Sequence, residues 1–421
     1  MQTMSVSNSG HHRHPTRRRA LWRPTALAAC TLGLLVACGG GDGDGDGDGG
    51  GGGGSSAPAT YTTATSSVLA GSDTYGYTNH ADPLQARFTR IWGLTGDGAG
   101  NLYVADFDSG AMRYVGSNGA VGTYAGAEPP GGGAYFDNPN PLVARFYGPA
   151  QLVRASNGTL YVADSNNHCI RKIAPGANAT TAGAVTTVAG VCGTTTEGFN
   201  NGVASTARFR LPFGLALDEA QQVLYVADTE NNRIRKIKLG SLAAADAVTT
   251  LAGNEAYGSA DGQGSAARFY HPQGLARDAQ GNLFVADGFN STIRKVDANG
   301  QVSTLAGTPQ QRGYANGAGS GAKFYGPAGV AADANGSIYV ADRGNNVIRM
   351  LRPNGSGGYT ASTLAGAQPT NGKDPAPPGA GIGSAAATQF KEVTALWLDG
   401  KGMLYTGERD GSRIVKLTLQ R

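Results

Sequence analysis

The side chains that most often carry out catalysis or bind metals are few in this sequence and widely separated. Beyond the first sixty of the 421 residues, the histidines are His80, His168 and His271. They form no H-x-H or H-E-x-x-H spacing, so the sequence does not support a zinc site of the usual kind. Asp399 and Glu408 could contribute to a calcium site, but their spacing is not diagnostic of one. We therefore predict no cofactor; a calcium ion bound in the interior is the alternative.

The N-terminal stretch has the composition of an export signal. Three arginines at positions 17–19 precede an apolar run over residues 26–37, which is too short for a comfortable transmembrane helix. The run ends in LVAC at residues 35–38, which resembles the bacterial lipobox, and this resemblance implies cleavage before Cys38 and lipidation of its sulfur. The alternatives are an ordinary signal peptide or a buried core segment. We expect residues 1–37 to be a signal peptide and Cys38 to carry a lipid.

A stretch rich in glycine and aspartate separates this cysteine from the rest of the chain. Residues 39–54 contain only these two residue types, so they cannot bury apolar surface and should form a flexible tether. We assign residues 38–58 to the lipidated cysteine and its tether, and residues 59–421 to one folded domain. The expected location is the cell envelope, on the outer membrane or the periplasmic face if the organism is Gram-negative. The formal net charge of +4 is too small to indicate nucleic-acid binding.

Most of the remaining chain is one unit written six times. Each unit contains short alternating apolar runs separated by polar turns, as between Gly274 and Ala306, and each run is typical of a β-strand. Four antiparallel strands repeated in this way indicate the blades of a β-propeller. An Ala-Asp pair ends the second run of five units, and Gly407-Glu408 stands there in the sixth. We call these acids the anchor residues: Asp106, Asp164, Asp228, Asp287, Asp342 and Glu408.

The fourth strand of the last unit is missing from the C-terminus and stands at the N-terminus. The other units end in runs such as Val302 to Gly307, whereas the sixth stops after a third strand at 412–417. Ser66 to Gly71 repeats the missing pattern. We therefore predict that this N-terminal strand completes the last blade, which closes the ring without an open seam. The predicted fold class is all-β, a six-bladed β-propeller closed by its N-terminal strand.

These units resemble NHL repeats. The resemblance is carried by segments such as 272–276, 282–287 and 293–295, and Asn166-Asn167-His168-Cys169 comes close to the segment that names the family. It covers about residues 60–421 and implies the propeller fold. It implies no single function, because NHL-type propellers include binding modules, scaffolds and a few enzymes.

Residues that recur in every unit are predicted to serve the scaffold, because every blade needs them. The connections between units share Ala-Arg-Phe or a variant of it, and we expect its phenylalanines to fill the gaps between blades. Its arginines could form a ring that receives an anion, but a clamp onto a repeated aspartate or a loop carbonyl is favoured. A second arginine series follows the anchors by seven residues, with Val415 breaking it: Arg113, Arg171, Arg235, Arg294 and Arg349.

A binding site is better sought where the units differ. The residue before the first-strand glycine is aromatic in two units, Trp92 and Phe213, and small or polar in the others, including Gln273 and Thr394. First strands line the channel, so these side chains should lie near its mouth, on the face that carries the connections between units, here called the long-loop face. They could form an asymmetric pocket; the favoured alternative is that the two aromatics plug the channel or pack between blades. The candidate set is completed by Arg210, Tyr270 and His271.

Cys169 and Cys192 form an even pair in a chain that is predicted to be exported. Cys169 begins the third strand of the second unit, and Cys192 follows its fourth strand. Adjacent antiparallel strands bring these ends together, so we predict a disulfide within one blade. The alternatives are two free buried thiols or a catalytic cysteine, for which the sequence shows no partnered base.

The leading functional hypothesis is a non-catalytic binding or scaffold propeller on the cell envelope. It would recognise a protein, peptide or glycan through the long-loop face around the channel mouth, and a lipid would attach it to the membrane. The alternative, which rests on family precedent, is a metal-dependent lyase or lactone hydrolase acting in the central channel. A third hypothesis is a purely structural role between other components of the envelope.

Overall fold

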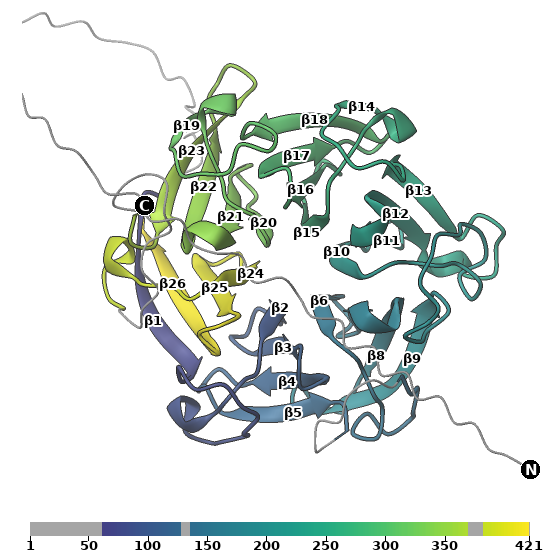
Figure 1. The fold of residues 1–421 in the computed structure, drawn as a ribbon. Helices are drawn as coiled ribbons and strands as arrows, with labels where there is room; N and C mark the ends of the chain where they lie inside the picture. The colour runs from purple at the N-terminus through teal and green to yellow at the C-terminus, as the bar shows by residue number, and fades with distance from the viewer. Residues whose placement is uncertain (1–60, 128–134, 369–381, 421) are drawn as a thin grey trace, which may run out of the picture. The chain divides into compact units, whose positions relative to one another are not determined.

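Six antiparallel blades surround a central channel in the computed structural model, which describes residues 61–127, 135–368 and 382–420. The predicted six-bladed β-propeller is therefore confirmed (Figure 1). The described residues contain single 3-10 turns but no α-helix, and none of these turns is long and apolar enough to cross a membrane. The predicted signal peptide, Cys38 and the tether lie outside the described residues.

In the first three blades, the strands follow one another from the channel outward in chain order. Blade 1 contains β2 (Ile91–Gly96), β3 (Leu102–Asp106), β4 (Ala111–Val115) and β5 (Val121–Ala125). Blade 2 contains β6 (Pro149–Arg154), β7 (Leu160–Asp164), β8 (Cys169–Pro175) and β9 (Ala182–Ala189). Blade 3 contains β10 (Pro212–Asp218), β11 (Val223–Asp228), β12 (Arg233–Lys238) and β13 (Val248–Gly253).

Blades 4 and 5 add a short fifth strand at the outer edge, which the sequence did not predict. Blade 4 contains β15 (Pro272–Arg277), β16 (Leu283–Asp287), β17 (Thr292–Val296), β18 (Gln301–Ala306) and the added β14 (Gly262–Gln263). Blade 5 contains β20 (Val330–Ala332), β21 (Ile338–Asp342), β22 (Val347–Pro353), β23 (Tyr359–Ala365) and the added β19 (Gly317–Ala318). Blade 6 contains β24 (Val393–Leu398), β25 (Met403–Glu408), β26 (Arg413–Gln420) and β1 (Thr63–Gly71).

The 3-10 turns occur at two kinds of place. Three follow the second strand of a blade: η2 (Ser165–Asn167), η3 (Thr229–Asn231) and η7 (Arg343–Asn345). The others lie in longer connections: η1 (Pro83–Gln85), η4 (Leu239–Ser241), η5 (Gly264–Ala266), η6 (Gly319–Gly321) and η8 (Ala385–Ala387).

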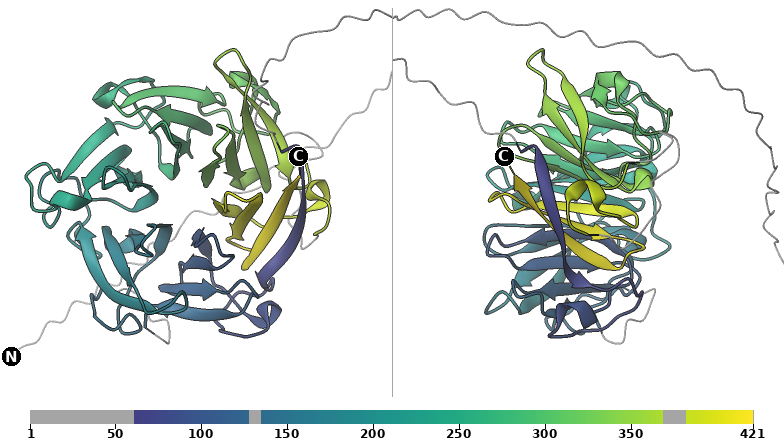
Figure 2. Two further views of the ribbon diagram at one scale, coloured as in Figure 1. Left: turned by 180° about the vertical axis from the view of Figure 1, so that it is seen from behind. Right: turned by 90° about the vertical axis from the view of Figure 1, so that its left-hand side faces the viewer.

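Strand β1 closes the ring, as predicted. It pairs antiparallel with β26, from Thr63 opposite Gln420 to Gly71 opposite Arg413, with one irregularity between Val68 and Ala70. Figure 2 shows this N-terminal strand lying along the outer side of the C-terminal blade. Both strands are longer than the sequence pattern indicated. The pairing leaves β26 with a partner on each side, so the last blade has no seam where the ring could peel open.

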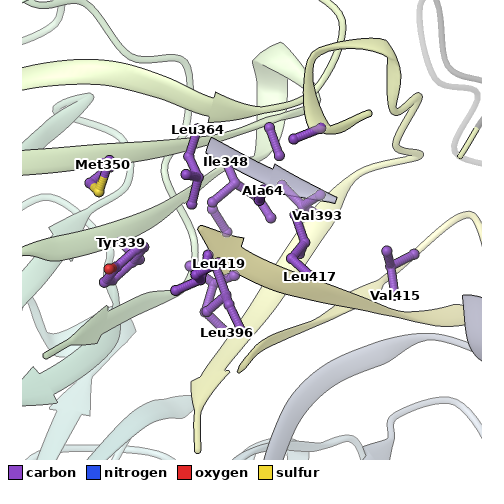
Figure 3. Packing of buried hydrophobic residues seen from close by; sticks show 14 of the residues in the cluster. Ala64, Tyr339, Ile348, Met350, Leu364, Val393, Leu396, Val415, Leu417 and Leu419 are labelled. Atoms are coloured by element: carbon purple, nitrogen blue, oxygen red, sulfur yellow. The ribbon is translucent and has the colours of Figure 1, made fainter. Parts of the chain in front are cut away.

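The hydrophobic core is divided among the interfaces between blades. One cluster combines Tyr339 and Ile348 of blade 5 with Leu396 and Leu417 of blade 6 (Figure 3). The phenylalanines of the repeated connections are all buried, which confirms their predicted place in the core. They are Phe88, Phe146, Phe209, Phe269, Phe324 and Phe390.

A buried ion pair in blades 1 to 5 confirms the predicted scaffold role of the anchor aspartates and of the arginines seven residues later. In blade 4, Arg294 Nη1 lies 2.9 Å from Asp287 Oδ2, and both side chains are buried. The same guanidinium donates to the carbonyls of Arg268 and Ala260 in the long connection, at 2.9 and 3.0 Å. Burial raises the pKa of Asp287 to about 6, against the opposing effect of Arg294. Each pair therefore fastens a connection to its own blade.

Two arginines of the Ala-Arg-Phe motif form the predicted clamp, and they do so through loop carbonyls. Arg208 and Arg268 donate to loop carbonyls, of Thr196 at 3.0 Å and of Ser265 at 2.7 Å. Neither pairs with a repeated aspartate, because the arginines on the third strands take those carboxylates.

Cys169 and Cys192 form a disulfide within blade 2, which confirms that prediction. Their Sγ atoms are 2.07 Å apart and their Cα atoms 5.2 Å apart. Cys169 is the first residue of β8, and Cys192 lies just beyond β9, so the bond joins the ends of two neighbouring strands.

Candidate functional site

Trp92 and Phe213 meet at the mouth of the central channel. Trp92 lies on β2 of blade 1 and Phe213 on β10 of blade 3, and these blades are not neighbours, so the contact crosses the channel. The ring centroids are 5.1 Å apart in an edge-to-face arrangement, and the ring of Phe107 lies 6.2 Å from Trp92. The two rings therefore pack against one another in a geometry in which aromatic pairs attract.

Two arginines stand beside the indole of Trp92. The Cζ atoms of Arg343 and Arg409 lie 5.6 and 5.5 Å from its centroid, within the range of cation–π attraction. They occupy the position in blades 5 and 6 that Phe107 occupies in blade 1, directly after the anchor residue. Arg409 also pairs with Glu392, and burial lowers the pKa of Arg343. Neither arginine was predicted from the sequence, although the position after the anchor varies between units just as the position of Trp92 does.

Gln273 and Thr394 occupy the equivalent position on β15 and β24, and both are buried. The hydroxyl of Thr394 donates to the carbonyl of Ile91 at 2.5 Å, so it links blade 6 to blade 1. The side-chain carbonyl of Gln273 has no hydrogen-bond partner among the described residues. The hydroxyl of Thr394 is therefore used within the propeller itself, whereas the side-chain oxygen of Gln273 can still accept a hydrogen bond from a ligand.

Further along the channel, the first strands of all six blades line a cavity of about 270 Å³. The described residues that line it include no carboxylate. Asp399 accepts hydrogen bonds from the backbone N–H groups of Lys401 and Met403, and Glu408 is buried beside Arg413. The described ranges also hold no group of three or more His, Cys, Asp or Glu placed to bind a metal. The two acids considered for calcium thus have other partners.

Arg210, Tyr270 and His271 come together on the long-loop face, where blades 3 and 4 meet. Tyr257, Tyr270, His271 and Phe289 form what we call the aromatic cluster. The ring of Tyr270 lies 4.7 Å from that of Tyr257 and 5.0 Å from that of Phe289, and His271 stacks on Phe289 at 4.2 Å. Tyr257 is 65% exposed, whereas the other rings are half-buried. The sequence did not indicate Tyr257 or Phe289, which come from separate loops.

Backbone geometry fixes the two central rings of this cluster. His271 has a φ of 53°, in the left-handed region, immediately before Pro272 begins β15. Its N–H donates to Oδ1 of Asn232, which ends the turn after η3, at 3.0 Å. The N–H of Tyr270 donates to Oδ1 of the buried Asp287 at 2.8 Å. The scaffold therefore sets the positions of both rings before any ligand binds.

A cavity of about 690 Å³ lies beside the aromatic cluster, and we call it the blade 3–4 cavity. Arg210 Nε lies 3.3 Å from Glu197 Oε2, and His271 Nδ1 lies 3.5 Å from Glu230 Oε1. Burial lowers the pKa of His271, against the opposing effect of Glu230, so the imidazole is neutral at pH 7. The charged and aromatic residues of the lining are Glu197, Phe199, Arg210, Glu230, Arg233 and Glu255.

Comparison with known families agrees with this architecture. The family model of the teneurin NHL domain matches residues 138–315, and that of the NHL repeat matches residues 324–349. The described domain is a propeller of NHL repeats. The resemblance noted in the sequence is thus confirmed for the family.

Relatives of this NHL propeller match over only part of their own length. NHL repeat-containing protein 2 of Gallus gallus is 35% identical over 167 residues, which is 37% of this chain and 22% of that protein. The chain thus spans about a fifth of that relative's length.

Two solved structures share the fold. A protein of unknown function from Bacteroides thetaiotaomicron VPI-5482 is 19% identical, with a TM-score of 0.63 over 85% of this chain and 76% of its own. An auxiliary nutrient binding protein from Bacteroides ovatus ATCC 8483 is 16% identical, with a TM-score of 0.61 over 86% of this chain and 78% of its own. At these identities, the likeness shows the fold alone.

Proposed function

We propose that this NHL propeller is a non-catalytic binding module that recognises a protein, peptide or glycan through its long-loop face. The blade 3–4 cavity and the aromatic cluster would be the centre of that site. Rigid loops that present aromatic side chains around a cavity are the usual form of such a site. The channel mouth, where Trp92 and Phe213 pack together, would border it.

The position of the exposed apolar side chains carries this proposal. Within the described ranges, every exposed large apolar residue belongs to a connection between the last strand of one blade and the first strand of the next. Isolated exposed apolar residues are ordinary, but their restriction to one class of loop indicates a surface that a partner covers. These residues are Tyr75, Leu84, Tyr135, Phe136, Leu142, Val143, Tyr147, Phe199, Tyr257 and Ile382.

The test applies the purified chain to peptide and glycan arrays. The variant combines Tyr75→Ser, Tyr147→Ser and Tyr257→Ser, which remove exposed rings from three connections. We expect it to lose the wild-type array signals about tenfold or more while its melting temperature stays unchanged, because exposed rings contribute little to folding. Ala298→Ser, in the exposed turn between β17 and β18 at the opposite end of blade 4, is the control. Undiminished binding by the triple variant would contradict the proposal.

We also propose that a lipid on Cys38 holds the domain at the cell envelope, with residues 39–58 as the tether. The LVAC sequence at 35–38 and the glycine- and aspartate-rich stretch after it support this. The natural host, or a related bacterium, would be labelled with palmitate and fractionated. Cys38→Ala should lose both the label and the membrane association, whereas Cys30→Ala, within the signal core, should keep both. Membrane association of an unlabelled Cys38→Ala variant would count against the anchor.

A further inference from the structure

Blade 3 buries one arginine more than its anchor acid can neutralise. Arg235 donates to Oδ2 of Asp228 at 2.6 Å, as its counterparts do in other blades. The rest of the Asp228 carboxylate is also occupied, by the side chain of Asn231 at 2.9 Å and by the N–H of Arg210 at 2.8 Å. Arg233 is buried as well, and no carboxylate in the described ranges forms an ion pair with it. Its charge is therefore surplus.

The scaffold does not need an arginine at position 233. Four other blades carry a smaller residue without positive charge there: Ala111, Cys169, Thr292 and Val347. Blade 6 has Arg413 at this position, but Arg413 pairs with the anchor Glu408 in place of the arginine that Val415 replaces. Only blade 3 has both arginines. Burying a guanidinium without a carboxylate costs free energy, so its presence calls for another explanation.

Arg233 lines the blade 3–4 cavity, and its contacts leave much of its guanidinium available. The residue is 8% exposed, and its Nη1 donates to the carbonyl of Asn231 at 3.3 Å. Its Cζ lies 3.7 Å from the ring centroid of Phe199, which is itself 43% exposed. A planar guanidinium stacked on a ring still presents its donors at its edge, where a carboxylate binds in a bidentate manner.

The same cavity carries negative charge in its more exposed parts. Glu197 is paired with Arg210, and Glu230 lies beside His271, whose imidazole is neutral. Glu255 is exposed and forms no ion pair with any residue that the structure describes. One buried positive charge thus lies within reach of glutamates in the same cavity.

We propose that the blade 3–4 cavity binds a zwitterionic ligand of the class of free amino acids and short peptides. The ligand carboxylate lies against Arg233, and its ammonium group lies against Glu230 and Glu255. The inference rests on the proposed function, because it names the ligand of the same face. A phosphate would meet the repulsion of Glu230 and Glu255, whereas a zwitterion satisfies both signs. The volume of about 690 Å³ is in the range of small-ligand sites.

Isothermal titration of the full chain with three matched probe series tests this directly. The probes are free amino acids and dipeptides, their N-acetylated forms and their C-terminal amides. We expect at least one free form to bind about tenfold or more tightly than both of its derivatives, because each derivative leaves one buried or partly buried charge without a partner. Comparing the affinities of the free amino acids with those of the dipeptides shows which of the two ligand types the cavity binds.

Two variants assign the two charges, and two more serve as controls. Arg233→Gln should weaken the binding of the free probe about tenfold, so that the free probe no longer binds more tightly than its amide. Glu255→Gln should reduce the difference in affinity between the free probe and its N-acetyl form. Lys172→Gln, a half-buried lysine on β8 of blade 2, should leave all affinities unchanged. Because Arg233→Gln could lose stability through Phe199, Arg233→Lys is included, which keeps the charge and should keep the preference for the free form over the amide.

The proposal is overturned if no free probe binds the wild type, or if folded Arg233→Gln binds free and amide forms as the wild type does. Neither result would contradict the proposal that the propeller is a binding module, as long as the triple tyrosine variant still loses its array signals. If the triple variant keeps its array signals while the titrations behave as expected, the broader face is wrong and the cavity alone is the site.

Discussion

Arg413 Nε lies 3.0 Å from Glu408 Oε1, and this contact restores in blade 6 the buried ion pair that the other blades build differently. Blades 1 to 5 use an aspartate and an arginine seven residues later, but Val415 occupies that second position in blade 6. The anchor is a longer glutamate there, and the arginine comes two residues earlier. Arg413 Nη2 also donates to the carbonyl of Gln389 at 2.7 Å, which is the loop contact its counterparts make. The loss of the arginine at position 415 is therefore compensated by Arg413, which makes the same two kinds of contact.

Removing one member of such a pair should destabilise the ring strongly. Arg294→Met leaves Asp287 buried without its cation, so we expect the free energy of unfolding at pH 7 to fall by about 3–5 kcal/mol. The loss should be smaller at pH 5, because the pKa of Asp287, already raised to about 6 by burial, rises further without Arg294 and the carboxyl becomes neutral. Chemical denaturation at the two pH values measures this. Lys295→Met, at the half-buried neighbouring position, should change stability little.

The repeat pattern predicted the blades because alternating runs and anchors report local backbone structure directly. It predicted the closing strand for the same reason: Ser66 to Gly71 carries the pattern that the last unit lacks. The alignment of the repeats could not predict that Arg413 would take over the role that position 415 has in the other blades. This change of role depends on the extra length of the Glu408 side chain, which only matters once the third strand is in place.

His168 should make stability depend on pH. Its Nδ1 accepts from the N–H of Leu211 at 3.2 Å and so joins blade 2 to blade 3. Burial lowers the pKa of His168 below its ordinary 6.5. The unfolded chain therefore takes up a proton below pH 6.5 before the folded chain does, and stability falls as the pH drops through that window. Asn232 and Asn346 fill the same position in blades 3 and 5.

The measurement is the free energy of unfolding between pH 5 and 8 for the wild type and His168→Asn. The variant should keep the acceptor for Leu211, and its stability relative to the wild type should be lower at pH 8 than at pH 5, because only the wild type loses the contribution of a neutral His168 as the pH drops. A difference that grows toward pH 5 in the wild type's favour would contradict this role.

The disulfide of blade 2 should stabilise the folded chain measurably. Its loop of about 24 residues corresponds to roughly 3 kcal/mol in the chain-entropy treatment. We expect the double variant Cys169→Ala, Cys192→Ala to lose about this amount in chemical denaturation. A reductant should lower the stability of the wild type toward that of the variant and leave the variant unchanged. If a reductant did not change the free energy of unfolding of the wild type, that result would argue against the disulfide.

Trp92 and Phe213 should be coupled energetically across the channel. Their rings are 5.1 Å apart at right angles to within a few degrees, the geometry in which aromatic pairs attract. A double-mutant cycle with Trp92→Ala and Phe213→Ala should give a coupling of about 1 kcal/mol in the free energy of unfolding. Phe107→Ala paired with Phe213→Ala provides the comparison, and purely additive losses for Trp92 and Phe213 would show that the rings do not brace the channel.

The candidate site was harder to predict than the fold. Trp92 and Phe213 could be paired from the sequence because they occupy the same position in two units. Tyr257 and Phe289 could not, since one lies in a long connection and the other in a turn, and their meeting depends on loop conformation. Arg233 carried a visible signal, as a second arginine two residues before Arg235, but its meaning requires knowing that Asp228 is already fully bonded.

Hydrogen–deuterium exchange of the full chain, with and without a ligand selected on the arrays, tests most directly whether this propeller binds through its long-loop face. We predict slower exchange in the connections at 197–211 and 253–271 and in the turn at 288–291, because these segments carry the blade 3–4 cavity and the aromatic cluster. Protection confined to turns at the other end of the blades, such as 297–300, or to the strands that line the channel, would contradict it.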